Sequence, residues 1–433
     1  MATVTVTQQK LVMNTFASIF QNNLISAEIA NWHQYDTEMN DRNGLQVIEQ
    51  VGPRYAVTTT TDGVADLSSG VQDTVFGSEI FKVNKTFGTS MGWGDFVKIR
   101  DIGAARESEA LKKAALRLAT DIDAYILGYA QKASNNWVGN ANGTNALSAY
   151  SDIAAGITRL RKEGVDDEVR AVLAYDDWQA LGTSIVSNNA SLTDLGEGTY
   201  RSGFAGNVAG VPTMFTQQLQ PLVVGTRVAS GTTLTNQPSS PAVTYASVCV
   251  SGAPGNWLTS TINLDGQTGS VTLTDGEVFT IAGVYAYDPR AKKQLEHLQQ
   301  FRVVGNFTAA SGAFSNVRIF PAIITSGACQ TVVNTNSGGT FDNLSVTHIG
   351  VASSATMPRL LINKSSIVVH TADLIMPATG TASRKALTKV PLSVRMWQDS
   401  VFATGEHRIR FDVALEANVS AGGRTRLVRV NGA

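Results

Sequence analysis

The sequence predicts an α+β protein in which one long helix stands among many short strands. Three observations lead to this prediction: an amphipathic stretch at 104–134, extended runs on both sides of it, and a region at 222–334 where helix patterns almost vanish. With 433 residues, 43% of them hydrophobic, the chain is long enough for two or three packed units with substantial cores.

Charged residues are scarce and nearly balanced. They make up 16% of the chain, against a usual ~25%, and the formal net charge is −1. No basic tail or patch is present, so we do not expect tight nucleic-acid binding. A polar but weakly charged surface favours large packed interfaces over a freely diffusing monomer.

Cysteine usage and hydropathy indicate the compartment. Cys249 and Cys329 fit neither a zinc-site spacing nor a disulfide framework, which favours free thiols in a reducing cytoplasm. The sequence shows no signal-peptide pattern and no uncharged apolar run of the ~20 residues that span a bilayer. We therefore expect a protein that is made in a reducing cytoplasm and has no membrane partner.

The stretch 104–134 predicts a single long amphipathic helix. Its apolar residues recur at steps of three and four and form one stripe: Leu111, Ala115, Leu118, Ile122, Ile126 and Tyr129. Glu109 can pair with Lys113, and Arg117 with Asp121, one turn further along. The helix is either a core helix of a globular enzyme or a spine on which sheets from both ends of the chain are arranged.

Residues 8–32 predict a second amphipathic helix, close to the N-terminus. Its apolar side carries Leu11, Val12, Phe16, Ile19, Phe20 and Leu24. Such an arm docks either on its own domain or on a neighbouring chain, and the sequence leaves both possibilities open. We take Phe16 and Phe20 as candidate subunit-contact residues.

Between residues 45 and 95 the pattern changes to short extended runs. They lie at 47–48, 55–61 and 82–87, and turn residues such as Asp62-Gly63 separate them. Because a two-stranded excursion is poorly stable alone in water, it needs its own sheet or another subunit to lie on. Further candidate subunit-contact residues are Arg54, Asp62, Asp66, Lys82, Lys85 and Arg100.

The rest of the chain predicts a mixed α/β block with a β-rich interruption. Helices are expected at 150–164 and 176–187, the second capped by its leading Asp, with a buried strand at 171–175 between them. Evenly spaced strands in 222–334 favour a small antiparallel barrel or sandwich. Further strands are expected at 366–371, 391–396, 408–415 and 427–430.

The most distinctive residues are Gly276–Tyr285 (GEVFTIAGVY), followed by Asp288-Pro289 and Leu298–Phe301, and preceded by the Gly-rich passage Gly203–Met214. In these residues, and in the order of its elements along nearly the whole chain, the sequence resembles the major capsid protein of tailed bacteriophages. The resemblance is closest to the subclass whose peripheral α/β domain carries an inserted all-β barrel domain.

This resemblance implies a domain organisation. It consists of an N-terminal arm at 1–44, an extended hairpin loop at 45–95, a spine-helix domain at 96–139 toward the hexamer rim, an axial α/β domain from 140–221 and 335–433, and an inserted β-barrel domain at 222–334. The hairpin would reach over an adjacent subunit.

The resemblance also implies a function. The chain would be a structural virion protein without catalytic residues, cofactor or metal, assembling as hexamers and pentamers into an icosahedral head shell in the host cytoplasm. Its partners would be sister copies, a scaffolding protein, a portal protein and packaged double-stranded DNA bound without sequence specificity. Two other functions stay open: a cargo-holding nanocompartment of the same fold, and a carbohydrate-binding β-protein.

Motifs for enzyme chemistry are weak. Gly88–Gly92 matches G-x-S-x-G, but an extended run follows it where a hydrolase needs a helix, so we interpret it as a turn between strands. None of the 5 histidines has the i, i+4 spacing of a helical metal site. Adjacent carboxylates such as Asp176 and Asp177 point to different sides and cannot form an acid/base pair. One branch of the capsid fold joins Lys to Asn between subunits, yet no motif singles out Lys82 or Lys85 for it.

Overall fold

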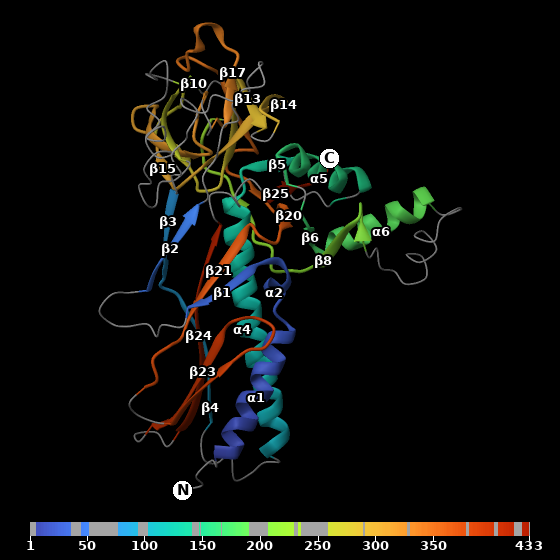
Figure 1. The fold of residues 1–433 in the computed structure, drawn as a ribbon, viewed down its shortest axis with the longest axis vertical. Helices are drawn as coiled ribbons and strands as arrows, with labels where there is room; N and C mark the ends of the chain where they lie inside the picture. The colour runs from blue at the N-terminus through green and yellow to red at the C-terminus, as the bar shows by residue number, and fades with distance from the viewer. Residues whose placement is uncertain are drawn as a thin grey trace, which may run out of the picture. The chain divides into compact units, whose positions relative to one another are not determined.

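The computed structural model describes the chain as two compact units. Unit 1 contains Met1–Val47, Phe81–Tyr129 and Ile367–Val419, and unit 2 contains Ile48–Ile80, Ala130–Ser366 and Ser420–Ala433. The residues that the structure describes are 6–35, 45–51, 77–93, 103–140, 147, 149–165, 167–189, 207–228, 233–234, 259–288, 291–326, 330–377, 381–401, 406–419 and 427–432. Figure 1 shows the elements.

Unit 1 is built on a sheet that gathers strands from both ends of the chain. Its order is β1-β21-β24-β23-β22, and β4 also pairs with β24. Strand β1 runs parallel to β21, whereas the other pairs are antiparallel. The strands are β1 (Asn31–Tyr35), β4 (Thr86–Trp93), β21 (Ile367–Ala372), β22 (Thr381–Ala386), β23 (Ser393–Val401) and β24 (Glu406–Val419).

The long helix α4 spans Gly103–Ala133, which confirms the predicted helix within one residue at each end. Five residues of the predicted stripe are buried: Leu111, Ala115, Leu118, Ile122 and Ile126. Tyr129, the sixth, is half-buried, and its hydroxyl donates to Asn418 Oδ1 of β24 at 3.0 Å. The apolar period therefore identified the buried face of the helix.

The N-terminal arm folds back onto its own chain. The expected helix at 8–32 is in fact two helices and a strand: α1 (Val6–Asn22), α2 (Ser26–Ile29) and β1. Asn22 and Asn23 end the first helix, since Asn favours a turn over a helix interior. Because β1 pairs with β21 along its whole length, the structure favours docking of the arm on its own domain.

The hairpin expected at 45–95 is only partly described. Strands β2 (Leu45–Val51) and β3 (Gly77–Val83) form a two-stranded sheet of their own. The run expected at 55–61 lies outside the described residues. The run expected at 82–87 ends β3 and begins β4, which belongs to the sheet of unit 1.

Unit 2 contains a mixed sheet covered by α5 (Tyr150–Lys162) and joined to α6 (Tyr175–Asn189). Its order is β5-β25-β20-β6-β8-β7. The apolar residues of α5, Ile153, Ile157 and Leu160, pack on this sheet, as their spacing predicted. The strands are β5 (Asn136–Val138), β6 (Val169–Leu173), β7 (Asn207–Val208), β8 (Val211–Phe215), β20 (Arg359–Asn363) and β25 (Leu427–Val430).

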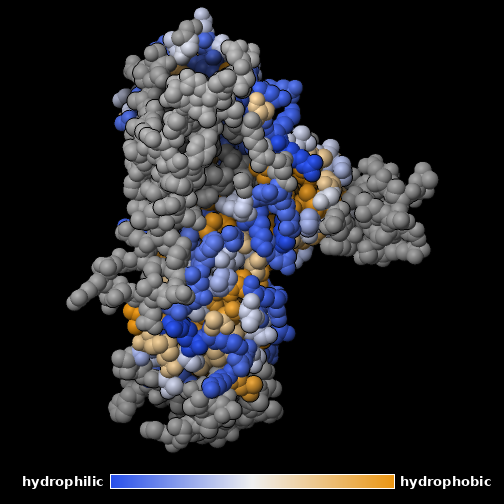
Figure 2. All heavy atoms as spheres, in the orientation of Figure 1, coloured by the Kyte–Doolittle hydropathy of each residue, from blue (hydrophilic) through white to orange (hydrophobic). Residues whose placement is uncertain are grey.

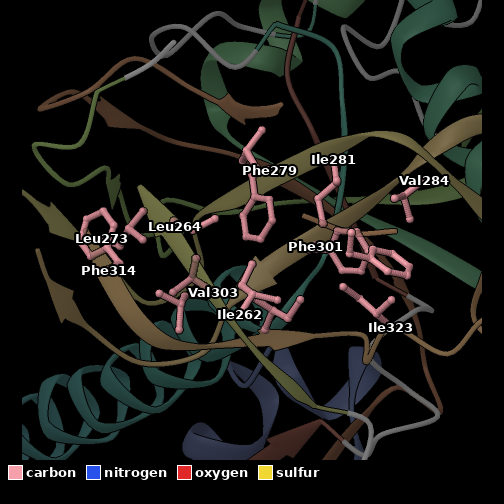
Figure 3. Packing of buried hydrophobic residues seen from close by; sticks show 14 of the residues in the cluster. Ile262, Leu264, Leu273, Phe279, Ile281, Val284, Phe301, Val303, Phe314 and Ile323 are labelled. Carbon is pink, nitrogen blue, oxygen red and sulfur yellow. The ribbon is translucent and has the colours of Figure 1, made fainter. Parts of the chain in front are cut away.

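The predicted β-rich region forms an antiparallel sheet in unit 2. Its order is β10-β11-β16-β14-β13-β17, and β18 also pairs with β13. Its inward side chains form one apolar cluster, in which Phe279, Phe301 and Phe314 lie among aliphatic residues (Figure 3). The strands are β10 (Thr233–Leu234), β11 (Ser260–Asp265), β13 (Val278–Asp288), β14 (Lys293–Val303), β16 (Phe314–Phe320), β17 (Val332–Asn334) and β18 (Val346–Ile349).

The expected boundary of this region at 334 is too early. Strand β18 lies beyond it and pairs with Val278–Ile281 of β13. The small sheet of β9 (Leu222–Val223) and β19 (Ala355–Thr356) joins the two ends of the region. Closure into a barrel, and separation as an inserted domain, stay predictions. The remaining short elements are β12 (Thr272–Leu273), β15 (Phe307–Thr308) and η1 (Ser337–Gly339).

Within the described ranges, none of the helices is both long enough and apolar enough to traverse a bilayer.

Candidate subunit interface

Two of the predicted contact residues belong to the core of their own chain. Phe16 and Phe20 are 0% exposed, and the ring of Phe16 stacks on Phe411 of β24 with 3.8 Å between ring centroids. Because the chain's own sheet already covers both rings, we correct their assignment from subunit contact to intramolecular core. Leu11, expected on the same apolar side, is instead 66% exposed.

Lys82 and Lys85 are both exposed, at the junction of β3 and β4. The ammonium group of Lys85 lies 3.9 Å from the ring centroid of Tyr125 on α4, a cation–π contact. Lys82 is the more available of the two for a contact in trans. The other predicted contact residues lie outside the described residues: Arg54, Asp62, Asp66 and Arg100.

The structure also shows exposed apolar side chains that sequence reasoning missed. On the face drawn in Figure 2, apolar patches alternate with hydrophilic ones. The large exposed hydrophobic residues are Leu11, Tyr150, Tyr175, Trp178, Val223, Val351, Ile375 and Met376. Apolar periodicity did not predict their exposure, because Leu11 lies on a predicted apolar side and most of the others lie at element ends or in connections.

Ile375 and Met376 are presented on a braced connection in unit 1. They are 43% and 38% exposed. Arg395 Nη1 donates to the carbonyl of Ile375 at 2.6 Å, and Arg384 forms an ion pair with Asp373 at 3.0 Å. An apolar pair held in a fixed position loses little conformational entropy on contact, which suits a protein interface.

Asp123 of α4 holds the joint between the two helices of the arm. Its carboxylate is buried and accepts hydrogen bonds from the amides of Ile25 and Ser26, each at 2.9 Å. Burial raises the pKa of Asp123 to about 6, against the opposing effect of the hydrogen bonds from Ser26 and Ile25. The arm is therefore fixed to the long helix by a buried polar contact.

Tyr125 and Glu416 join α4 to β24. The Tyr125 hydroxyl donates to Glu416 Oε1. Burial, reinforced by this hydrogen bond to a carboxylate, raises the pKa of Tyr125 far above its ordinary value. The phenol therefore stays protonated and acts as a fixed donor, not as a proton-transfer group.

Asp176 and Asp177 have the different environments that their adjacency predicted. Asp176 is exposed, whereas Asp177 is 0% exposed and forms a buried ion pair with Arg359 at 2.7 Å. Asp177 Oδ2 also accepts from the amide of Ala174 at 2.8 Å, so it caps α6 in place of the expected Asp176. The contacts of Asp177 therefore stabilise the fold, and the two adjacent carboxylates form no acid/base pair.

The G-x-S-x-G match lies inside β4, not in a turn between strands as expected. Gly88 faces Asp412 across the β4–β24 pair, and a Cβ at this position would lie 2.4 Å from Asp412 Oδ1. Asp412 is buried and accepts from Arg395 at 2.7 Å and Arg410 at 2.6 Å. Gly88 thus makes room for a buried charge cluster, and no nucleophile elbow forms.

Metal-ligating groups do not converge in the part of the chain that the structure describes, where no group of three or more His, Cys, Asp or Glu is found. His348 and His370 are both buried, and burial lowers their pKa values to about 3 and about 4. Both histidines are therefore neutral residues of sheets. Cys249 and Cys329 lie outside the described residues.

The distinctive residues Gly276 and Glu277 have structural roles. Gly276 has φ +92° and lies against the end of α4, where a Cβ would meet the Lys132 backbone at 3.0 Å. Glu277 is buried, forms an ion pair with Arg227 at 2.5 Å and accepts from the amide of Gly225 at 2.8 Å. Both residues connect the antiparallel sheet to the rest of unit 2.

A family model described as "P22 coat protein - gene protein 5" matches residues 1–421. No curated protein matches the chain.

The chain also matches several solved phage structures over most of its length. One from Mycobacterium phage Che8 shares 10% identity with a TM-score of 0.46, covering 94% of this chain and 90% of that one. The capsid of cyanophage P-SCSP1u shares 8% with a TM-score of 0.44, covering 95% and 88%. The capsid of Ralstonia phage GP4 shares 8% with a TM-score of 0.42, covering 90% and 82%. At these TM-scores the likeness carries no further conclusion.

Proposed function

Because the chain belongs to the P22 coat protein family and is a major capsid protein that forms the head shell of a phage, we propose that its shell contacts are made by the β2–β3 hairpin and by exposed apolar side chains. The N-terminal arm, in this proposal, stabilises its own subunit. This family membership favours the phage head over the cellular nanocompartment and the carbohydrate-binding protein that the sequence left open.

The proposal rests on the pairing of the β2–β3 hairpin. Among the described strands, β2 and β3 pair with each other and with no other sheet. A two-stranded ribbon is marginally stable alone in water, so a neighbouring subunit would supply the missing packing. The contact residues we propose on and beside it are Arg54, Asp62, Asp66, Lys82, Lys85 and Arg100.

The remaining features of the proposal follow from a closed shell. Subunits are arranged as hexamers and pentamers, assembled in the host cytoplasm with a scaffolding protein and a portal protein around double-stranded DNA. The net charge of −1 supports enclosure of DNA without sequence-specific binding. The chain acts by shape and many weak contacts, without catalysis, and the Lys–Asn bond of some capsids is not needed for it.

Deletion of the hairpin tests the proposal. Residues 48–80 are replaced by a short Gly/Ser linker, and the chain is purified with and without scaffolding protein. We expect subunits with unchanged thermal unfolding that no longer form closed particles by electron microscopy. Particles of normal size and yield from the deletion variant would contradict the proposal.

A control separates assembly from folding. Lys82→Glu reverses one exposed charge of the hairpin and leaves the strand pair intact. We expect folded subunits that assemble more slowly, with a defect that depends on ionic strength because the contact is electrostatic.

A further inference from the structure

Where α4 ends, unit 2 contains a buried layer rich in hydrogen-bond donors. We call it the helix-end layer, and it consists of Asn135, Trp137, Arg302, Arg429 and Asn431. Trp137 and Arg429 are register partners in the parallel β5–β25 pair, so their side chains share one face of the sheet. Asn431 follows two residues after Arg429.

Arg429 carries a buried positive charge that has no carboxylate partner among the residues the structure describes. It is 0% exposed; Nη1 donates to the carbonyl of Gly276 at 2.7 Å, and Nη2 donates to the carbonyl of Ser134. The nearby acid, Asp275, lies 3.8 Å from Arg302 and is partly exposed. Burial, and then the charge of Arg302, lower the pKa of Arg429 to about 9. The Arg429 guanidinium therefore lies near a second guanidinium, that of Arg302, and near the weakly negative end of α4.

Several polar atoms of the layer have no hydrogen-bond partner within the described part of the chain. They are Arg429 Nε, Trp137 Nε1, Asn135 Oδ1 and both side-chain amide atoms of Asn431. Asn431 and Asn135 are 0% exposed and Trp137 is 7% exposed, so bulk water does not satisfy these groups. The guanidinium of Arg429 lies 5.2 Å from the ring centroid of Trp137, which places the N–H groups of these two residues in one neighbourhood.

We propose that the helix-end layer binds a small inorganic anion of the chloride class, held by the N–H donors of Arg429, Trp137 and Asn431. An anion provides a negative charge beside the buried guanidinium of Arg429, and it accepts from donors that otherwise remain unpaired. Water would satisfy the donors but not the charge. The anion would stabilise the connection of α4 and β25 to the turn at Gly276, and through it the subunit that enters the shell.

Unfolding of the full-length chain as disassembled subunits tests the proposal. Urea unfolding is measured at constant ionic strength while chloride replaces gluconate. For one bound ion, each tenfold rise in chloride above half-saturation lowers the unfolding equilibrium constant about tenfold. An unfolding constant that does not depend on chloride would overturn the proposal.

Two variants locate the site. Trp137→Phe removes one N–H donor and keeps an aromatic ring, so the chloride dependence should shift to higher concentrations. Asn431→Asp places a carboxylate beside Arg429, so the dependence should disappear and stability in gluconate should rise. Trp397→Phe, the same change on β23 in unit 1, is the control and should keep the wild-type dependence. If Trp137→Phe also kept the wild-type chloride dependence, the ion would bind elsewhere and the proposal would be overturned. This outcome can be read even if Asn431→Asp failed to fold.

Discussion

Ser26 is joined to Asp123 by a hydrogen bond of 2.9 Å from its backbone amide to the buried carboxylate. The two residues are 97 positions apart, and their contact fixes the N-terminal arm to the long helix. A second bond of the same length, from Ile25, uses the other carboxylate oxygen. The N-terminal arm is thus held on the long helix of its own chain.

Acidification should raise the stability of the folded subunit through Asp123, because protonation removes a buried charge. Burial raises its pKa from 3.8 to about 6, so the folded state binds this proton more tightly than the unfolded chain. Its contribution to the free energy of unfolding should rise by about 3 kcal/mol as the pH falls from about 6 to about 4, and stay constant above that window.

The comparison of wild type with Asp123→Asn, by urea unfolding between pH 4 and 7, isolates this effect. Buried His348 and His370 act in the opposite direction, because their lowered pKa values make stability fall as the pH drops from about 6.5 toward their folded values. They are present in both proteins and cancel in the difference. A difference that does not vary with pH would contradict the assignment.

Gly88→Ala should destabilise unit 1 by about 1–3 kcal/mol, because the new Cβ would lie 2.4 Å from Asp412 Oδ1 in the buried charge cluster. Gly182→Ala is the matched control. It lies in α6 with nothing within 4 Å of an added Cβ, so we expect it to be neutral or stabilising by up to about 1 kcal/mol. Thermal unfolding measures both. Equal effects of the two variants would argue against the close approach at Gly88.

Phe16→Ala should lower the free energy of unfolding by about 3–5 kcal/mol, since it removes a fully buried ring that stacks on Phe411. Leu11→Ala, on the same helix but 66% exposed, should change it by less than about 0.5 kcal/mol. Urea unfolding of disassembled subunits gives both values. If Phe16→Ala left subunit stability intact and blocked only assembly, Phe16 would be a contact between subunits after all.

Replacing the exposed pair Ile375 and Met376 by Ser should weaken assembly without weakening the fold. We expect unchanged thermal unfolding and a subunit concentration at half-assembly raised about tenfold or more, because apolar area is lost from an interface. Light scattering of assembly reactions measures this concentration. Normal assembly of the double variant would remove this pair from the proposed contact surface.

The sequence was most informative about helices whose buried residues recur at regular spacing within the helix itself. The stripe from Leu111 to Ile126 and the apolar residues of α5 lie where their spacing placed them. Prediction failed where a partner distant in the sequence decides the outcome. The arm continues as strand β1 because it pairs with β21, more than 330 residues away. Asp177, and not Asp176, caps α6 because the carboxylate of Asp177 is buried in an ion pair with Arg359.

The interface was the least predictable part. Phe16 and Phe20 were apolar enough to suggest a contact, but only the position of Phe411 shows that their own chain covers them. The helix-end layer was also missed. Arg429 and Asn431 belong to no sequence motif, and their burial follows from the pairing of β25 with β5. Ile375 and Met376 lie in a short connection, where apolar periodicity gives no information about exposure.

The location of the arm in the assembled shell tests the account most directly. Lys385 Nζ lies 2.5 Å from Asn14 Oδ1, so Cys residues introduced as Asn14→Cys and Lys385→Cys lie within reach of a short bis-maleimide cross-linker between α1 and β22. Shells of this double variant are treated with the cross-linker, denatured and run on a reducing gel, with each single variant as a control. We predict shells whose chains run as single, internally cross-linked chains; a ladder of chains joined only in the double variant would show that the arm crosses to a neighbour and would contradict the account.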